Sequence, residues 1–128
     1  MAVTTNLRDT TANSESLAGA NTVTKRIDFS DYNMVATDIL QLFDLENGQR
    51  IMIKLNVITG QGATCTADLI TTESTPVTIM TAANLETAGL IVAPVTIWTI
   101  SEDCIVTLVA DHTTDAAVID VSVTMLDQ

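Results

Sequence analysis

The sequence is poor in the residue types from which most catalytic and metal sites are built. Its 128 residues include one histidine, two cysteines, one tryptophan, one tyrosine and two phenylalanines. A zinc site normally draws several His and Cys ligands, and a nucleophilic triad needs an activated Ser or Cys beside a base. Because there is a single histidine and no G-x-S-x-G motif, we expect a protein that is not an enzyme, with no catalytic residues, no metal ligands and no cofactor.

Basic residues and long apolar runs are also scarce. Five Lys and Arg residues face sixteen Asp and Glu residues, which gives a formal charge of −11 at pH 7. So acidic a surface repels phosphate, and we therefore expect neither nucleic acid nor a membrane as a partner. No apolar run approaches the roughly 20 residues of a membrane helix, and "MAVTTNLRDTTANSES" (1–16) lacks the apolar segment of a signal peptide. Nothing in the sequence therefore indicates secretion.

The abundant residues are β-branched. The chain has twelve Val, twelve Ile and twenty-two Thr, and it is 47% hydrophobic with only 3% aromatic residues. Side chains of this kind are stiff and fit a pleated sheet better than a helix, so the composition predicts a single β domain with an aliphatic core. Cys65 and Cys104 each lie in a strand-like run. We expect two separate buried thiols there, with a disulfide as the alternative.

Alternating apolar and polar residues mark the strands. The clearest runs are "RIMIKLNVIT" (50–59) and "AAVIDVSVTML" (116–126), whose period of two is typical of half-buried strands. Several more short runs lie between turn signals, while 81–94 fits either a helical turn at 82–88 or an extended loop. The pattern predicts an all-β, antiparallel β-sandwich, jelly-roll-like, with about seven or eight strands over residues 22–128. We expect its core to include Ile51, Ile53, Leu55, Val57, Ile119, Val121 and Val123.

The first 21 residues differ from the rest. They are rich in Thr, Asn, Ser and Ala and show no sustained period, which predicts an extended N-terminal arm outside the sandwich. A polar arm becomes ordered only when something holds it, so we expect it to lie across a neighbouring subunit or a larger assembly. The contacts expected from the arm are Thr4, Asn6, Leu7 and Arg8.

The stretch "VADHTTDAAVID" (109–120) contains the residue types most typical of a catalytic or metal site. It holds the only histidine, His112, close to Asp111, Asp115 and Asp120, a combination that can bind a metal or transfer protons. The same residues suit a hairpin loop between two strands, because Asp and Thr side chains bond nearby backbone amides. We favour the hairpin loop. A second tight hairpin is expected at "ENGQ" (46–49), and the many carboxylates fit a solvated surface better than a calcium site.

Three longer segments, taken in order, resemble one protein family. They are "RIDFSDYNMVATDILQLFDLENGQRIMIKLNVITG" (26–60), "ATCTADLITTES" (63–74) and "TIWTISEDCIVTLVADHTTDAAVIDVSVTMLD" (96–127). Their succession of an opening strand, a Gly-containing turn, a long alternating strand, a Thr-rich strand and a closing hairpin is similar to the head decoration proteins of tailed bacteriophages. These are also called cement or head-stabilising proteins. The resemblance covers roughly the last 100 residues and rests on loose motifs.

The resemblance implies a role as well as a fold. It implies a β-sandwich made in the cytoplasm of a host bacterium and placed on the capsid exterior of the virion, often as a homotrimer. Its partners would be the major capsid protein and further copies of itself. Alternatives are another phage structural component, such as a head fibre base or a tail protein, a carbohydrate- or cell-surface-binding module, and a small hydrolase that uses His112. The binding module would need an aromatic or calcium-lined groove, which the sequence does not indicate.

Overall fold

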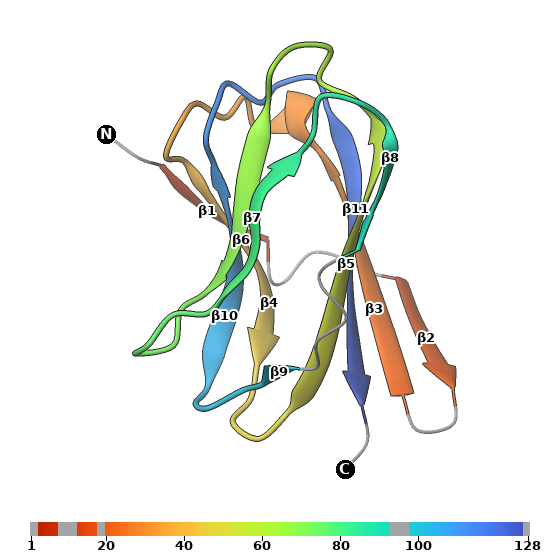
Figure 1. Ribbon diagram of the computed structural model, residues 1–128, viewed down its shortest axis with the longest axis vertical. Coiled ribbons are helices and arrows are strands. Elements are labelled where there is room, and N and C mark those ends of the chain that lie inside the picture. Colours follow the sequence, from red (N-terminus) through yellow and green to blue (C-terminus); the bar gives the residue numbers. More distant parts are fainter. Residues whose placement is uncertain (1–2, 8–12, 18–19, 93–97, 127–128) are drawn as a thin grey trace.

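The chain is built from short strands that pack as two layers (Figure 1). The computed structural model describes residues 3–7, 13–17, 20–92 and 98–126. In this part of the chain the elements are β1 (Thr4–Asn6), β2 (Asn13–Leu17), β3 (Ala20–Asp28), a 3-10 turn η1 (Phe29–Asp31), β4 (Ile39–Leu45), β5 (Arg50–Thr59), β6 (Thr66–Thr71), β7 (Thr78–Asn84), β8 (Gly89–Val92), β9 (Trp98–Thr99), β10 (Cys104–Ala110) and β11 (Val118–Leu126).

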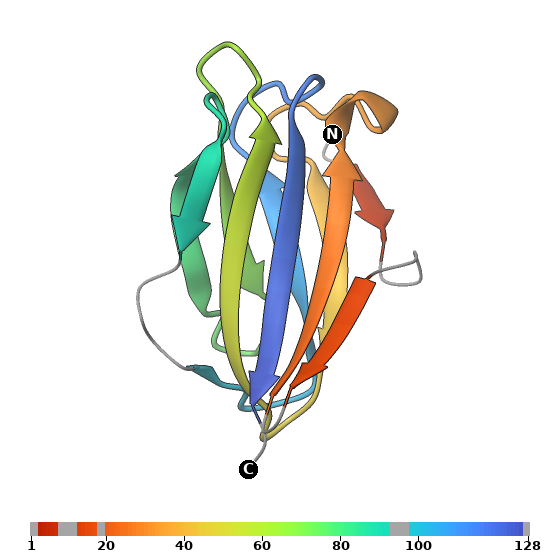
Figure 2. The same cartoon turned by 90° about the vertical axis from the view of Figure 1, so that its right-hand side faces the viewer.

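The strands form two sheets. Sheet A has the order β1-β4-β10-β6-β7, and sheet B has the order β2-β3-β11-β5-β8, with β9 also paired to β5. All pairs are antiparallel except β1 with β4. Figure 2 looks onto sheet B, where β5, β11 and β3 run side by side across the middle of the layer. The prediction of an all-β, antiparallel sandwich is confirmed.

The connections give the sandwich its topology. The chain changes sheet between β1 and β2, β3 and β4, β4 and β5, β5 and β6, β7 and β8, β9 and β10, and β10 and β11. Four strands of each layer, β3-β11-β5-β8 and β4-β10-β6-β7, therefore interleave in the order of a jelly roll, which is built from two Greek keys. Strands β1 and β2 extend one edge of each layer.

Two of the predicted hairpins are wrong. Residues 46–49 join β4 to β5 and residues 111–117 join β10 to β11, and in both cases the two strands belong to different sheets. Turn-forming residues and alternating flanks look the same whether a chain returns along its own sheet or crosses to the other. At the first corner Gly48 has φ of +90°, a left-handed conformation that favours glycine. The ambiguous stretch 82–88 is not helical; it contains the end of β7 and the turn before β8.

The space between the sheets is filled mainly by aliphatic side chains. The seven residues expected in the core all lie there, each at most 3% exposed, on the inward positions of β5 and β11. Phe29, Leu40, Leu42 and Leu108 face them from other elements and are fully buried. Cys65 and Cys104 are buried, free thiols, as expected. The strands that show the clearest alternation therefore provide the centre of sheet B.

The N-terminal segment differs most from its prediction. Thr4–Asn6 form β1, which pairs in parallel with β4, and Asn13–Leu17 form β2, which pairs with β3. Leu7 is only 5% exposed and belongs to the core. These two strands consist mostly of polar residues and show no apolar alternation, so the sequence pattern does not predict them. An edge strand is held largely by its backbone hydrogen bonds. Of the four expected arm contacts, Thr4, Asn6 and Leu7 thus lie in or beside a strand of the chain's own sheet, and Arg8 lies outside the described residues.

Candidate functional site

His112 lies in the connection between β10 and β11. Its Nδ1 accepts a hydrogen bond from the backbone N–H of Thr66 (3.3 Å), at the start of β6. The Thr66 hydroxyl donates to the carboxylate of the adjacent Asp111 (3.0 Å). The imidazole and its neighbouring carboxylate thus tie the 111–117 loop to sheet A. This arrangement is a structural anchor for the loop.

Gln61, which the sequence did not single out, organises the remainder of this loop. Its side-chain oxygen accepts the backbone N–H groups of Asp115, Ala116 and Ala117 at 3.2, 2.9 and 3.0 Å. Its amide nitrogen donates to the carboxylate of Asp115 at 2.7 Å. Throughout the described parts of the chain, no three His, Cys, Asp or Glu side chains are grouped so that they could hold a metal ion. Gln61 thus fixes residues 115–117 of the connection that crosses from sheet A to sheet B.

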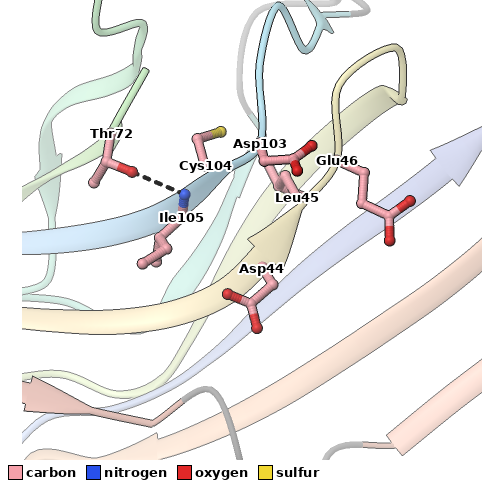
Figure 3. A pocket seen from close by; sticks show the side chains of 7 residues that line it. All are labelled: Asp44, Leu45, Glu46, Thr72, Asp103, Cys104 and Ile105. Carbon is pink, nitrogen blue, oxygen red and sulfur yellow. Dashed lines mark hydrogen bonds between the residues drawn. The ribbon is translucent and has the colours of Figure 1, made fainter. Parts of the chain in front are cut away.

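A hollow of about 390 Å³ lies at the opposite end of β10 (Figure 3). The Oδ1 of Asp103 accepts the backbone N–H of Asn47 (2.9 Å), and the hydroxyl of Thr72 accepts that of Ile105 (2.9 Å). Burial raises the pKa of the Cys104 thiol to about 11, and the nearby charge of Glu73 adds to this effect. A thiol with such a pKa is a poor nucleophile at neutral pH. The lining residues are Asp44, Leu45, Glu46, Thr72, Asp103, Cys104 and Ile105.

Glu73 is a buried carboxylate beside this hollow, 4% exposed. Burial alone would raise its pKa, but hydrogen bonds from the hydroxyl and backbone N–H of Ser101 and from the hydroxyl of Thr71 outweigh it, so the pKa is lowered. The Thr71 hydroxyl lies 2.7 Å from Oε1 and the Ser101 N–H lies 2.9 Å from Oε2. The ionised carboxylate thus joins the loop after β6 to the loop before β10, which is a structural role.

The N-terminal strand is attached by two buried polar residues. At its start, the Asp38 carboxylate accepts the backbone N–H groups of Val3 (2.9 Å) and Val35 (3.1 Å). The hydrogen bond from Val3, followed by that from Val35, lowers the pKa of Asp38. At its end, the Leu7 N–H donates to Gln41 O (2.8 Å), while the Leu7 carbonyl accepts from the ammonium of Lys25.

Lys25 occupies an inward position of β3 and is 3% exposed. Its ammonium also donates to the carbonyl of Leu42 (2.8 Å) and lies 5.0 Å from the centroid of the Phe43 ring. The register between β4 and β10 shifts at this point, so Leu42 has no partner residue on β10. A β-bulge leaves such a residue outside the ladder. Lys25 thus supplies the donor that the bulge removes, which explains a lysine in an otherwise apolar alternation.

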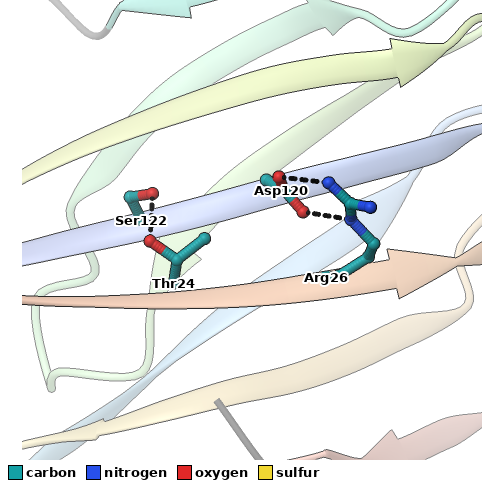
Figure 4. A network of polar contacts seen from close by, with 4 residues as sticks. All are labelled: Thr24, Arg26, Asp120 and Ser122. Carbon is teal, nitrogen blue, oxygen red and sulfur yellow. Dashed lines mark hydrogen bonds and ion pairs between the residues drawn. The ribbon is translucent and has the colours of Figure 1, made fainter. Parts of the chain in front are cut away.

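The outward side of sheet B carries an ordered polar surface. We use the term outer face of sheet B for the outward residues of β3, β11 and β5. Hydroxyl pairs join Thr24 to Ser122 at 2.8 Å and Thr22 to Thr124 at 3.0 Å. Arg26 and Asp120 form a two-pronged ion pair with contacts of 2.8 and 2.9 Å (Figure 4). These cross-strand contacts hold the side chains of β3 and β11 in fixed positions.

Strand β5 adds both basic and apolar side chains to this face. Met52 and Ile58 are 37% and 40% exposed, and Arg50 and Lys54 are also exposed on the same side. A smaller hollow of about 190 Å³ adjoins Met52, Ile53, Lys54 and Thr124. A surface that combines unpaired basic side chains with exposed apolar ones suits contact with another protein better than catalysis. The part of the chain that the structure describes contains no helix that is long and apolar enough to cross a membrane.

Comparisons with known proteins found similar structures but no similar sequence family. The sequence matches no protein family and no curated protein. A chain in the acidic stable capsid structure of Helicobacter pylori bacteriophage KHP30 matches with a TM-score of 0.58 and 12% identity, over 91% of this chain and 93% of that one. A chain in the capsid of Ralstonia phage GP4 matches with a TM-score of 0.60 and 15% identity, over 89% and 88%. At these identities the likeness establishes a shared fold along nearly the whole length.

Proposed function

We propose that this chain is a structural component of a phage particle, bound to the outside of the capsid, where it stabilises the lattice of the major capsid protein. The observation that carries the proposal is the jelly-roll fold, shared over about nine-tenths of the chain with proteins in two phage capsid structures. The sequence resemblance to head decoration proteins supports the same role independently.

The local chemistry supports a role without catalysis. His112 is bonded to Thr66, Cys104 has a raised pKa, and Glu73 is occupied by hydroxyl and backbone donors. His112 and Glu73 hold loops in place, and the raised pKa keeps the Cys104 thiol protonated at neutral pH. The surface is strongly acidic, which opposes direct contact with the DNA inside a capsid. A position on the exterior of the shell is compatible with that charge.

Stabilisation would follow from mass action. A ligand that binds only the assembled shell stabilises it by the free energy of binding, about 2.7 kcal/mol per site when its free concentration is 100 times the dissociation constant. An oligomer that contacts several capsid subunits at once gains further affinity, because the later contacts are intramolecular. We include a homotrimer in the proposal. We also propose that the protein is made in the bacterial cytoplasm and reaches the virion by binding the finished lattice.

The test uses particles of the phage that encodes this chain. Mass spectrometry of purified virions gives the number of copies per major capsid protein, and cryo-electron microscopy gives their position. Particles that lack the gene product should release their DNA at a lower temperature, and adding the purified chain should restore the original temperature. Density for the chain in a tail or a fibre, or its absence from the virion, would contradict the proposal. In the same assay a His112→Ala variant should restore stability fully.

The contact with the capsid needs a test that leaves the fold intact. Deleting residues 2–20 would remove β1 and β2, so lost binding would not separate contact from unfolding. Thr4 is exposed on β1, and Thr81 is exposed on β7 at the opposite edge of the same sheet. If the N-terminal strand touches the capsid, Thr4→Arg should weaken binding and Thr81→Arg should not. Equal binding by both variants would remove β1 from the contact.

A further inference from the structure

The exposed basic residues that the structure describes lie on one side of this protein. Of the five Lys and Arg residues, Lys25 points inward and Arg8 lies outside the described residues. The other three are Arg26, Arg50 and Lys54, and all three occupy the outer face of sheet B. Of the described carboxylates outside this face, Glu15 lies on β2, beside β3 in sheet B, and the others lie on sheet A, in η1 or in loops.

The outer face of sheet B therefore has the opposite charge balance to the rest of the chain. Its described carboxylates are Asp28 and Asp120, which against three basic residues leave a formal charge of +1, whereas the whole chain carries −11. One of the three cations, Arg26, is already paired with Asp120. Among the described residues, Arg50 and Lys54 form no ion pair. They stand on either side of Met52, at alternate positions of β5.

We infer that the outer face of sheet B binds the acidic surface of a second copy of this chain, in a head-to-tail arrangement. This inference rests on the self-association included in the proposed function. Two copies that present the same face to each other would bring like charges together. A head-to-tail contact instead places the cations of β5 against carboxylates of the neighbour, which lie mainly in its loops, with Asp44 and Asp68 on sheet A.

The contact has the composition of a protein interface. Met52 and Ile58 are exposed apolar side chains between polar ones, and they can lose their contact with water when a neighbour covers them. The hydroxyls of Thr24 and Ser122 already share one hydrogen bond within the sheet, so a neighbour that covers this pair has one remaining O–H donor to match. A contact between unlike surfaces repeats around a ring, and a closed ring of this kind includes the trimer.

Salt provides the first test, by sedimentation equilibrium of the full-length protein at two ionic strengths. Charge attraction acts over about 10 Å in 0.1 M salt and about 3 Å in 1 M salt. Association should therefore be clear in 0.1 M NaCl and much weaker in 1 M NaCl. Face-to-face association through apolar groups would strengthen with salt, because screening removes the repulsion between acidic chains. Stronger association in 1 M NaCl, or a monomer at both ionic strengths, would overturn the inference.

Variants matched in charge provide the second test. Lys54→Gln and Thr81→Glu both lower the net charge by one, the first on the outer face of sheet B and the second at the edge of sheet A. The dissociation constant of the oligomer should rise roughly tenfold for Lys54→Gln, as for other charges at an interface, and should not rise for Thr81→Glu. Lys54→Arg should associate as the parent does. Equal weakening by both charge variants would show a general charge effect and overturn the inference.

Capsid binding separates this inference from the proposed function. A chain that binds capsids but stays monomeric would refute the head-to-tail contact and leave the capsid role standing. Loss of capsid binding in Lys54→Gln with unchanged self-association would assign the face to the capsid instead, which also refutes the inference. Thermal unfolding of each variant should match the parent within a few degrees, because Lys54 and Thr81 are exposed.

Discussion

Replacing Leu7 with alanine tests whether the N-terminal segment is part of the fold. A free arm that becomes ordered only on a partner would give no change in the stability of the isolated chain. In the structure, however, the Leu7 side chain is 5% exposed and belongs to the core cluster, and its N–H and carbonyl bond to Gln41 and Lys25. We therefore expect Leu7→Ala to lower the free energy of unfolding.

The size of the effect follows from burial. Removing a buried leucine side chain costs about 2–5 kcal/mol, less where the surroundings can close over the space. Leu7 follows a three-residue strand at the edge of sheet A, where some closure is expected, so we take about 3 kcal/mol. For a domain of this size that corresponds to a fall in Tm of roughly 10 °C. Such a loss is a large part of the 5–15 kcal/mol that typically separates folded from unfolded states.

The assay is urea unfolding of the isolated chain, followed by circular dichroism, with thermal melts as a second measurement. Val3→Ala is the matched control, because Val3 lies just before the same strand but is 59% exposed. Its effect should stay within about 0.5 kcal/mol. A Leu7→Ala variant as stable as the parent would refute the reasoning and return residues 3–7 to the status of an arm.

Three further changes test other buried polar groups. Lys25→Met should lower the free energy of unfolding by roughly 1–3 kcal/mol, because the Leu7 and Leu42 carbonyls lose a buried donor. Removal of the desolvated ammonium offsets only part of this loss. Urea unfolding measures the change, and a variant as stable as the parent contradicts the prediction. The pKa of Asp38 is lowered from 3.8, so its contribution to folding stability is complete above pH of about 4 and is lost on further acidification. Asp38→Asn should therefore flatten the acidic part of a plot of Tm against pH. A curve parallel to that of the parent contradicts the prediction. The pKa of Cys104 is raised from 9.0 to about 11, so stability should fall as pH rises from 9 to 11, and Cys104→Ala should show a smaller fall in the same thermal melts.

Much of the fold follows from local patterns. Alternation in β5 and β11 marks the inward positions, and those side chains are buried as the pattern requires. The β-branched composition selects sheet over helix. Which strands pair is not contained in these signals, because a corner between sheets and a hairpin use the same turn residues. The sequence therefore predicts hairpins at 46–49 and 111–117, where the structure has corners between the two sheets.

The polar contacts are less predictable than the strands. Gln61 is one glutamine in a turn, yet it bonds three successive N–H groups more than 50 residues away. Lys25 interrupts an apolar alternation, and the reason is a bulge on β4 and a carbonyl at the end of β1. No sequence signal relates these residues to one another, because each depends on the backbone of a distant strand. The segregation of basic residues on one face likewise becomes visible only after β3 and β5 are placed in the same sheet.

The sequence by itself determined the fold class, the aliphatic core, the acidic charge and the scarcity of groups for metal or nucleophilic chemistry. These properties depend on composition and on a period of two, which are local and additive. The tertiary structure decided that the first residues join the sheets, that His112 anchors a corner, and that Arg26, Arg50 and Lys54 share one face. Those properties depend on the order of strands in two layers, and that order is set by contacts between residues far apart in the chain.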